Sequence, residues 1–259
     1  MTSVEGKTIV ISGAGSGIGQ AIAKRFAQDG ATVIGTDVNR EGLAQLDGVQ
    51  NVFTTHADVS DWAEVKASVD FAIEKTGQVD VYINNAGIAM EEAIVDTDVD
   101  RFALLHRIHV LGTLHGMKAA LGPMREQGSG HILNVISRVA ETDTVNMSAY
   151  ASAKAAMWSM TRIGAAENAD RGIVVSALFP GISRTAMTAA GGIGDPSQLG
   201  EPDQEYDTFK MLATLDPGQN DGQDNGKVWF HGQIYPMFQD DNDLGQVTGG
   251  LAEGRASQS

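Results

Sequence analysis

The chain has no cysteine. This absence excludes disulfide bonds, thiol nucleophiles and zinc sites built from thiolates. Basic residues are also scarce, with 18 Lys and Arg against 33 Asp and Glu, which gives a formal net charge of −15. Because a surface of this sign repels polyanions, we expect neither nucleic acid nor a membrane as a partner.

Long apolar runs are missing as well. No stretch of about 18 apolar residues occurs, so no membrane-spanning helix is expected. The polar start of the chain, Met1–Lys7, does not resemble a signal peptide. Together with the lack of cysteine, these features favour a cytoplasmic protein. The hydrophobic fraction of 42% nevertheless excludes a disordered chain, and 259 residues suffice for one α/β domain.

Apolar runs that alternate with helical patterns predict the fold class. Six short runs have the character of buried strands: Thr8–Ser12, Thr32–Asp37, Val52–His56, Val79–Ile83, His131–Ile136 and Ile173–Phe179. Helical spacing of apolar residues follows at Ile18–Ala27, after Asp61, over Asp100–Arg125 and at Ala149–Glu167. This alternation predicts an α/β fold, a single-domain, doubly wound parallel sheet of the Rossmann type with helices on both faces. Such a sheet binds its ligand outside the carboxyl ends of its strands.

The composition changes near Gly191. Twelve acidic and three basic residues follow residue 194, so most of the net charge belongs to the last 65 residues. We interpret 1–259 as one dinucleotide-binding and catalytic domain, in which 186–226 is a substrate-covering loop and 239–259 a tail. Solvated loops are the plainer alternative for this region. One further strand is expected at Lys227–Phe230.

A glycine-rich loop is the first chemical signal. Gly13-Ala-Gly15-Ser-Gly17-Ile-Gly19 joins the first expected strand to the first helix. Glycine permits positive φ and a close approach of backbone N–H groups to a diphosphate, and the helix N-terminus adds partial positive charge. The strict G-x-G-x-x-G fingerprint does not fit, because Ile18 occupies its last glycine position. The place of the loop between strand and helix favours a dinucleotide site over an ordinary turn.

Asp37 bears on the choice of cofactor. It ends the second expected strand, 18 residues after Gly19. A carboxylate here accepts hydrogen bonds from the ribose hydroxyls of NAD and repels the 2′-phosphate of NADP. A surface-turn aspartate is the alternative, and Arg40 is close enough in sequence to oppose the preference. Asp58-Val59, after the third strand, either contacts the adenine or simply precedes a helix.

Five motifs, in this order, resemble the short-chain dehydrogenase/reductase family: Gly13-x-x-x-Gly17-x-Gly19, Asn84-Asn85-Ala86-Gly87, Ser137, Tyr150-x-x-x-Lys154 and Pro180-Gly181. The resemblance spans residues 4–188. It implies that Tyr150 is the catalytic acid/base, Lys154 its partner and Ser137 a hydrogen-bond donor to the substrate. It further implies that Asn84–Gly87 steadies the sheet beside the cofactor and that Pro180–Thr185 contacts the nicotinamide.

The chemistry of the reaction supports the same residues. Alcohol oxidation needs a base for the hydroxyl proton, and a free tyrosine, with a pKa of about 10, is a poor one unless a nearby ammonium stabilises its phenolate. Tyr150 and Lys154 stand four residues apart and so share one helix face. A second Tyr-x-x-x-Lys pair, Tyr206 and Lys210, has no serine at the matching distance. We interpret that pair as a chance match.

One residue departs from the family pattern. The family places an asparagine in the long helix before the serine strand, and its main chain helps to hold a water in a proton relay. Here the matching segment contains His109 instead. Two interpretations stay open: His109 is a structural substitute, or it takes part in proton transfer with a titration near neutral pH. No metal site is expected, because the histidines lack a carboxylate cluster at ligand spacing.

The sequence therefore predicts an NAD-dependent alcohol dehydrogenase or ketone reductase that moves a hydride between NAD and a secondary alcohol or ketone. We expect it to form a homo-oligomer, a tetramer or dimer. A non-catalytic NAD-binding sensor or scaffold on the same fold is the alternative, and a non-redox lyase a third class. The expected catalytic residues are Ser137, Tyr150, Lys154 and His109, and the expected NAD-binding residues are Gly13, Ser16, Gly17, Ile18, Gly19, Asp37, Asp58, Val59, Asn85, Ala86, Gly87, Tyr150, Lys154, Pro180, Gly181, Ile182 and Thr185.

Overall fold

The computed structural model describes residues 3–142, 144–181, 183, 199–218 and 224–235. In this part of the chain, one sheet is built from β1 (Thr8–Ser12), β2 (Thr32–Asp37), β3 (Val52–His56), β4 (Val81–Asn84), β5 (Gly130–Val135), β6 (Ile173–Leu178), β7 (Val228–Phe230) and β8 (Gln233–Tyr235). The strand order is β3-β2-β1-β4-β5-β6-β7-β8. Strands β1 to β7 pair in parallel, and β8 pairs with β7 in the antiparallel sense.

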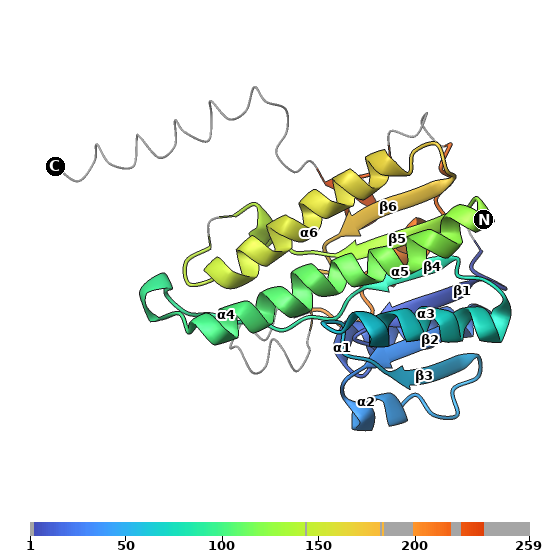
Figure 1. Cartoon of the computed structure of the whole chain (residues 1–259), viewed down its shortest axis with the longest axis horizontal. Coiled ribbons are helices and arrows are strands. Elements are labelled where there is room, and N and C mark those ends of the chain that lie inside the picture. The colour runs from blue at the N-terminus through green and yellow to red at the C-terminus, as the bar shows by residue number, and fades with distance from the viewer. Residues whose placement is uncertain (1–2, 143, 182, 184–198, 219–223, 236–259) are drawn as a thin grey trace.

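Helices cover both faces of this sheet. They are α1 (Gly17–Gln28), α2 (Arg40–Ala44), α3 (Trp62–Thr76), α4 (Val99–His106), α5 (Gly112–Gln127), α6 (Ser148–Glu167) and α8 (Tyr206–Leu212), with short turns η1 (Ile94–Asp96), η2 (Arg107–Leu111) and η3 (Arg138–Ala140). Helices α3, α5 and α6 pack on one face and lie toward the viewer in Figure 1. Helices α1 and α8 pack on the opposite face.

The strand residues show why both faces are covered. Within β1, Ile9 and Ile11 belong to the core beneath α1 and α8, whereas Val10 belongs to the core beneath α3 and α5. All five residues of β1 are buried. An apolar run without polar alternation is what a parallel sheet between two helical layers requires. The predicted doubly wound Rossmann fold is confirmed, with the addition of the antiparallel strand β8, which was not predicted.

The bounds of β4 differ from the prediction because a side chain takes the place of a ladder partner. The predicted strand began at Val79, but β4 begins at Val81. The side chain of Gln127 pairs with both backbone groups of Val79: Val79 N donates to Gln127 Oε1 at 3.0 Å, and Gln127 Nε2 donates to Val79 O at 2.9 Å. Val79 is buried and apolar, as the sequence indicates, but it does not pair with a neighbouring strand of the sheet.

The long helix predicted over Asp100–Arg125 is present with an interruption. Helices α4 and α5 are joined by the π-helical turn η2, which contains His109. A π-helical turn inserts one extra residue into the helical repeat and often occurs at functional sites. Pro123 stands inside α5, near its end. The interruption turns the side chain of His109 into the protein, where 1% of its surface is exposed.

The described part of the C-terminal region is more buried than the interpretation as solvated loops implies. Helix α8 lies inside the segment 186–226 that was predicted to be a substrate-covering loop, but its Tyr206, Phe209 and Leu212 are core residues beside Phe26 of α1. The strand predicted at Lys227–Phe230 is present as β7. The rest of the predicted loop, 186–198 and 219–223, and the predicted tail, 239–259, lie outside the described residues.

A polar cluster on Asp29 fastens α8 to α1. Asp29 Oδ2 accepts hydrogen bonds from Tyr206 Oη at 2.8 Å and from Lys210 Nζ at 2.6 Å. Beside it, Arg25 pairs with Asp203 at 2.7 Å and its guanidinium lies 4.4 Å from the centre of the Tyr206 ring. The Tyr-x-x-x-Lys pair that we interpreted as a chance match to the catalytic motif thus has a structural role.

We expect Asp29→Asn to weaken this attachment. The hydrogen bonds from Lys210 and Tyr206 lower the pKa of the Asp29 carboxyl below 3.8, so its contribution is present above that pH and disappears as the pH falls through the lowered pKa. The free energy of unfolding should fall by about 1 kcal/mol at neutral pH, since the pair is partly exposed, and the difference should shrink in acid. Urea denaturation at neutral and at acid pH measures the free energy of unfolding of each protein. Asp170→Asn, at an exposed residue, is the matched control, and equal stabilities of all three proteins would contradict the prediction.

Candidate active site

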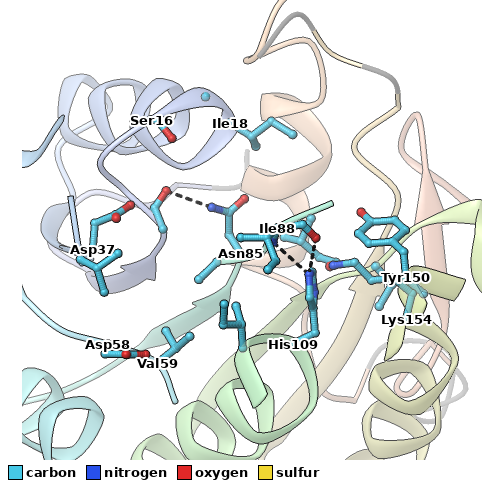
Figure 2. Close-up of a pocket in the computed structure, with 18 of the residues that line it drawn as sticks. Ser16, Ile18, Asp37, Asp58, Val59, Asn85, Ile88, His109, Tyr150 and Lys154 are labelled. Carbon is cyan, nitrogen blue, oxygen red and sulfur yellow. Dashed lines mark hydrogen bonds between the residues drawn. The ribbon is translucent and has the colours of Figure 1, made fainter. Parts of the chain in front are cut away.

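A cleft of about 350 Å³ opens at the carboxyl ends of the central strands (Figure 2). It brings together most of the residues predicted to act on the cofactor or substrate, because the loops that follow β1, β2, β3, β4, β5 and β6 all meet at this edge. Its lining includes Gly13, Ser16, Gly17, Ile18, Asp37, Asp58, Val59, Asn85, Ala86, Gly87, His109, Tyr150, Lys154 and Pro180. The predicted residues Gly19, Ser137 and Gly181 adjoin the lining without belonging to it, while Ile182 and Thr185 lie outside the described residues.

The glycine loop is held so tightly that side chains cannot fit. Gly13 has φ +71°, and a Cβ on it would lie 2.7 Å from Ala86 Cα. A Cβ on Gly19 would lie 2.1 Å from the carbonyl oxygen of Gly13. The first residue of α1 is Gly17, and the side chain of its N-cap residue, Ser16, makes no capping hydrogen bond. The N-terminal end of α1 therefore presents uncapped N–H groups beside the cleft. Such groups suit the binding of a diphosphate.

The turn after β4 holds this loop in place through hydrogen bonds. Asn85 Nδ2 donates to the carbonyl oxygens of Ser12 at 3.0 Å and Gly13 at 3.2 Å. Ser12 Oγ accepts from the backbone N–H groups of Asn85 at 3.1 Å and Ala86 at 3.2 Å, and donates to Ile83 O. Sequence reasoning missed Ser12. The sequence feature that could have identified Ser12 is a hydroxyl side chain at the end of a strand, immediately before the glycine loop.

Asp37 lies at the far end of the cleft from Tyr150, as Figure 2 shows. Its carboxylate accepts hydrogen bonds from Gly15 N at 2.9 Å and Asn39 N at 2.8 Å. A Cβ on Gly15 would lie 2.9 Å from the carboxyl carbon, so this glycine is required for the contact. The carboxylate is thereby fixed to the glycine loop, and its negative charge stands at the cleft.

A second loop forms the wall next to Asp37. Asp58 and Val59 line the cleft, and the Asp58 carboxylate accepts a hydrogen bond from Ser60 N at 2.8 Å. His115 of α5, which sequence reasoning did not select, has its Nδ1 2.9 Å from Val59 O. A Cβ on Gly112 would lie 2.9 Å from the Val59 side chain. Helix α5 therefore packs directly against the loop and holds it.

Tyr150 and Lys154 meet at the other end of the cleft. Both project from α6, and Lys154 Nζ lies 5.4 Å from the centre of the Tyr150 ring. Only 3% of Lys154 is exposed, and its ammonium donates to Val135 O at 2.7 Å. Ser137 is the N-cap residue of η3, after β5, and its hydroxyl shares a hydrogen bond with Tyr150. The three residues that the resemblance selects are thus brought together.

The pKa values of this pair differ from the simple expectation. Burial lowers the pKa of Lys154 to about 7, so its ammonium is only partly charged at neutral pH. Burial also raises the pKa of Tyr150 to about 12, against the smaller opposite effect of the Ser137 hydrogen bond. The expected lowering of the Tyr150 pKa by Lys154 is therefore absent from this arrangement. Because Tyr150 keeps some exposure to the cleft, a positive charge bound there would act on it directly.

His109 is enclosed between the turn after β4 and Tyr150. Its Nε2 lies 2.8 Å from Ile88 O and 3.0 Å from Ile88 N, so one tautomer donates to the carbonyl and the other accepts from the N–H. Its ring stands edge-on to Tyr150, with centres 5.4 Å apart. A Cβ on Gly87 would lie 2.4 Å from the imidazole. Burial first, and the Lys154 charge second, hold the pKa of His109 well below 6.5, so the ring is neutral at physiological pH.

The described residues offer neither a metal site nor a membrane-spanning helix. No group of three or more His, Asp or Glu side chains in these ranges has the geometry to hold a metal ion. Among the helices of the same part of the chain, none combines the length and the apolar character needed to cross a membrane.

Comparisons with known proteins identify the family of the chain. Residues 7–192 match the family described as short chain dehydrogenase. An uncharacterized oxidoreductase of Staphylococcus aureus is 35% identical over 209 residues, which cover 78% of this chain and 89% of that protein. The (S)-acetoin-forming diacetyl reductase of Staphylococcus epidermidis is 34% identical over 188 residues, 70% of this chain and 73% of that protein.

A solved structure extends the similarity to three dimensions. The crystal structure of levodione reductase has a TM-score of 0.77 and 29% sequence identity to this chain, and the match covers 86% of this chain and 95% of that one. The chain therefore belongs to the short-chain dehydrogenase/reductase family of oxidoreductases, whose members use NAD or NADP.

Proposed function

We propose that the protein is an NAD-dependent alcohol dehydrogenase or ketone reductase. The observation that carries this proposal is the arrangement of one cleft, with Tyr150 beside the buried Lys154 at one end and the fixed carboxylate of Asp37 at the other. Between them, the uncapped start of α1 and a loop too close for any Cβ offer room for a diphosphate. These residues fit a nicotinamide dinucleotide.

The preference for NAD rests on the charge at Asp37. Its carboxylate is held by two backbone N–H groups at the cleft and would repel a 2′-phosphate while accepting bonds from free ribose hydroxyls. The opposing cation, Arg40, is exposed at the start of α2. The remaining predicted contacts of the cofactor, including Ile182 and Thr185, are part of the same proposal.

The described residues account for the proton in the reaction. NAD, when bound, accepts or supplies the hydride and brings a positive charge in its oxidised form. In alcohol oxidation, Tyr150 Oη removes the hydroxyl proton as hydride leaves the carbinol carbon, and in ketone reduction it returns that proton to the oxygen. Ser137 donates a hydrogen bond to the same oxygen. The positive charge of oxidised NAD, together with the protonated form of Lys154 that Val135 O holds, would stabilise the negative charge on Tyr150.

The substrate that we propose is a small or medium-sized secondary alcohol or ketone. Two relatives are named for the reduction of diacetyl and levodione, both of which carry ketone groups. Apolar side chains of Ile88, Ile136 and Pro180 lie in the cleft near Tyr150 and suit the carbon skeleton of such a compound. The expected homo-oligomer and the cytoplasmic location remain part of the proposal.

His109 acts in this proposal as a structural substitute for the family's asparagine. Its Nε2 donates to Ile88 O in one tautomer or accepts from Ile88 N in the other, in the place where an amide side chain offers a donor and an acceptor. A ring whose pKa lies well below 6.5 does not change its charge near neutral pH, which disfavours the alternative of titrating participation.

The primary test compares cofactors and a tyrosine variant. Purified protein should oxidise secondary alcohols or reduce ketones with NAD(H) faster than with NADP(H), measured by the near-ultraviolet absorbance of reduced nicotinamide. Tyr150→Phe should reduce turnover at least about a thousandfold, because the proton acceptor is gone. The variant should still bind NADH, as measured by fluorescence titration. A wild type that binds NADH without turning over any carbonyl would favour the sensor, and a preference for NADP would contradict the role of Asp37.

Lys154 gives a prediction about stability. The unfolded chain protonates this lysine near pH 10.5, while the folded chain does so only near pH 7, so Lys154 destabilises the fold increasingly as the pH falls across that interval. Lys154→Met should therefore raise the Tm at neutral pH by a few degrees while abolishing turnover, and the gain should vanish in strong alkali. Lys118→Met, at an exposed lysine, is the control. A Tm difference independent of pH would contradict the lowered pKa.

The role of His109 is separable by two variants. His109→Asn keeps a donor and an acceptor for Ile88, and we expect the pH profile of turnover between about pH 6 and 9 to match that of the wild type. His109→Phe keeps an aromatic ring at this position but removes the hydrogen-bond partner of the backbone N–H and C=O of Ile88. We expect its kcat/KM to fall roughly tenfold or more. Loss of an ionisation from the profile in His109→Asn would instead show that the imidazole titrates during turnover.

A further inference from the structure

The turn after β6 is held by a side chain from a distant part of the chain. Pro180 lines the cleft, and Gly181 follows it with φ +67°. Gln204 Nε2 donates to Pro180 O at 2.9 Å and to Ser183 Oγ at 3.1 Å. The same turn also has the weaker bond from Ser183 Oγ to Pro180 O at 3.4 Å. The amide of Gln204 is therefore the principal side-chain partner of the turn among the described residues.

Two glycines leave space for this amide. A Cβ on Gly181 would lie 2.7 Å from Gln204 Nε2, and a Cβ on Gly200 would lie 1.5 Å from Gln204 Oε1. The φ of Gly200 lies outside the left-handed region, so its backbone conformation does not itself demand glycine. A methyl group at position 200 would therefore have to displace the amide of Gln204 from its present place. The backbones of Ser183 and Gly200 are also joined by a β-bridge.

The backbone that carries Gln204 is itself fixed. Its neighbour Asp203 pairs with Arg25 of α1, and Tyr206 binds Asp29 at the end of the same helix. On the other side, Glu205 is 2% exposed and pairs with His231 in the turn between β7 and β8. Gln204 therefore bonds the Pro180 turn from a segment attached to both α1 and the C-terminal hairpin.

We propose that Gln204 is a positioning residue that holds Pro180 and Ser183 in place at the nicotinamide end of the cleft. This inference rests on the proposed function, because it concerns how that cofactor is held. Gln204 itself does not belong to the lining of the cleft. It restricts a turn whose glycine would otherwise allow several backbone conformations, and so keeps the cleft wall in the position that aligns the nicotinamide with Tyr150.

The experiment uses two ligands that differ at one end. NADH carries the nicotinamide, whereas ADP-ribose lacks it but fills the rest of the dinucleotide site. In Gln204→Ala, the Kd for NADH should rise about three- to tenfold, the value expected for loss of one hydrogen bond, while the Kd for ADP-ribose stays within twofold of wild type. At saturating NADH, kcat should also fall, because misalignment affects the chemical step. Fluorescence titration and calorimetry measure the two affinities.

Gln127→Ala is the matched control. Gln127 is also exposed and also bonds a backbone carbonyl, that of Val79, just before β4 and away from the lining of the cleft. We expect this variant to lower the Tm without changing either Kd. If Gln204→Ala behaves in the same way, or if it weakens both ligands equally, the inference is wrong and Gln204 is a residue of general stability.

A double-mutant cycle tests the geometry. Gly200→Ala introduces a methyl group where the Gln204 amide lies, so it should displace that amide and weaken NADH binding as Gln204→Ala does. The double variant Gly200→Ala/Gln204→Ala should bind NADH no more weakly than Gln204→Ala alone, because the displaced group is absent. Additive losses would overturn the assigned contact. A wild type that fails to bind NADH would refute the proposed function, whereas normal NADH binding in Gln204→Ala would refute only this inference.

Discussion

The close approach of the loop after β1 to the turn after β4 determines the shape of the cleft. Gly13 lies against Ala86 with no room for a Cβ, and Asn85 and Ser12 exchange hydrogen bonds across the contact. This junction fixes the start of α1 relative to the centre of the sheet. It also fixes where the chain continues toward Ile88. The positions of the glycine loop and of His109 thus both depend on this contact between the two backbones.

At the Tyr150 end of the cleft, the burial of polar groups determines their pKa values. Lys154 is enclosed and bonded to a backbone carbonyl, Tyr150 is bonded to Ser137, and His109 shares its nitrogen with Ile88. Burial disfavours the charged form of each of the three, which lowers the pKa of the two bases and raises that of the phenol. Such an arrangement stabilises the fold less than an apolar one would. Strongly shifted pKa values in a cleft are typical of functional sites, which supports the proposed roles of these residues.

Sequence reasoning identified the parts of the site whose signals are local. The glycine loop, Asp37 and the Tyr150/Lys154 pair depend on short spacing and on the ends of strongly apolar strands, and the structure places them in one cleft. Sequence reasoning did not select Ser12, His115 and Gln204, because their hydrogen-bond partners lie 21 to 74 residues away in the sequence. A hydrogen bond over that separation leaves no periodic pattern. The π-helical turn at His109 is equally invisible, since one extra residue hardly disturbs the helical spacing of its neighbours.

The acidic C-terminal region shows how a compositional signal can mislead about burial. Its surplus of carboxylates suggested solvated loops, but the described part uses several of them as attachments: Asp203 pairs with Arg25 and the buried Glu205 pairs with His231. Between these polar contacts, Tyr206, Phe209 and Leu212 recur at helical spacing and enter the core. A helix of seven residues is too short to be stable alone, so its packing against α1 must supply the stability that its length does not. The polar contacts then set its position, and Gln204, directly before it, acquires a fixed place from which to hold the Pro180 turn.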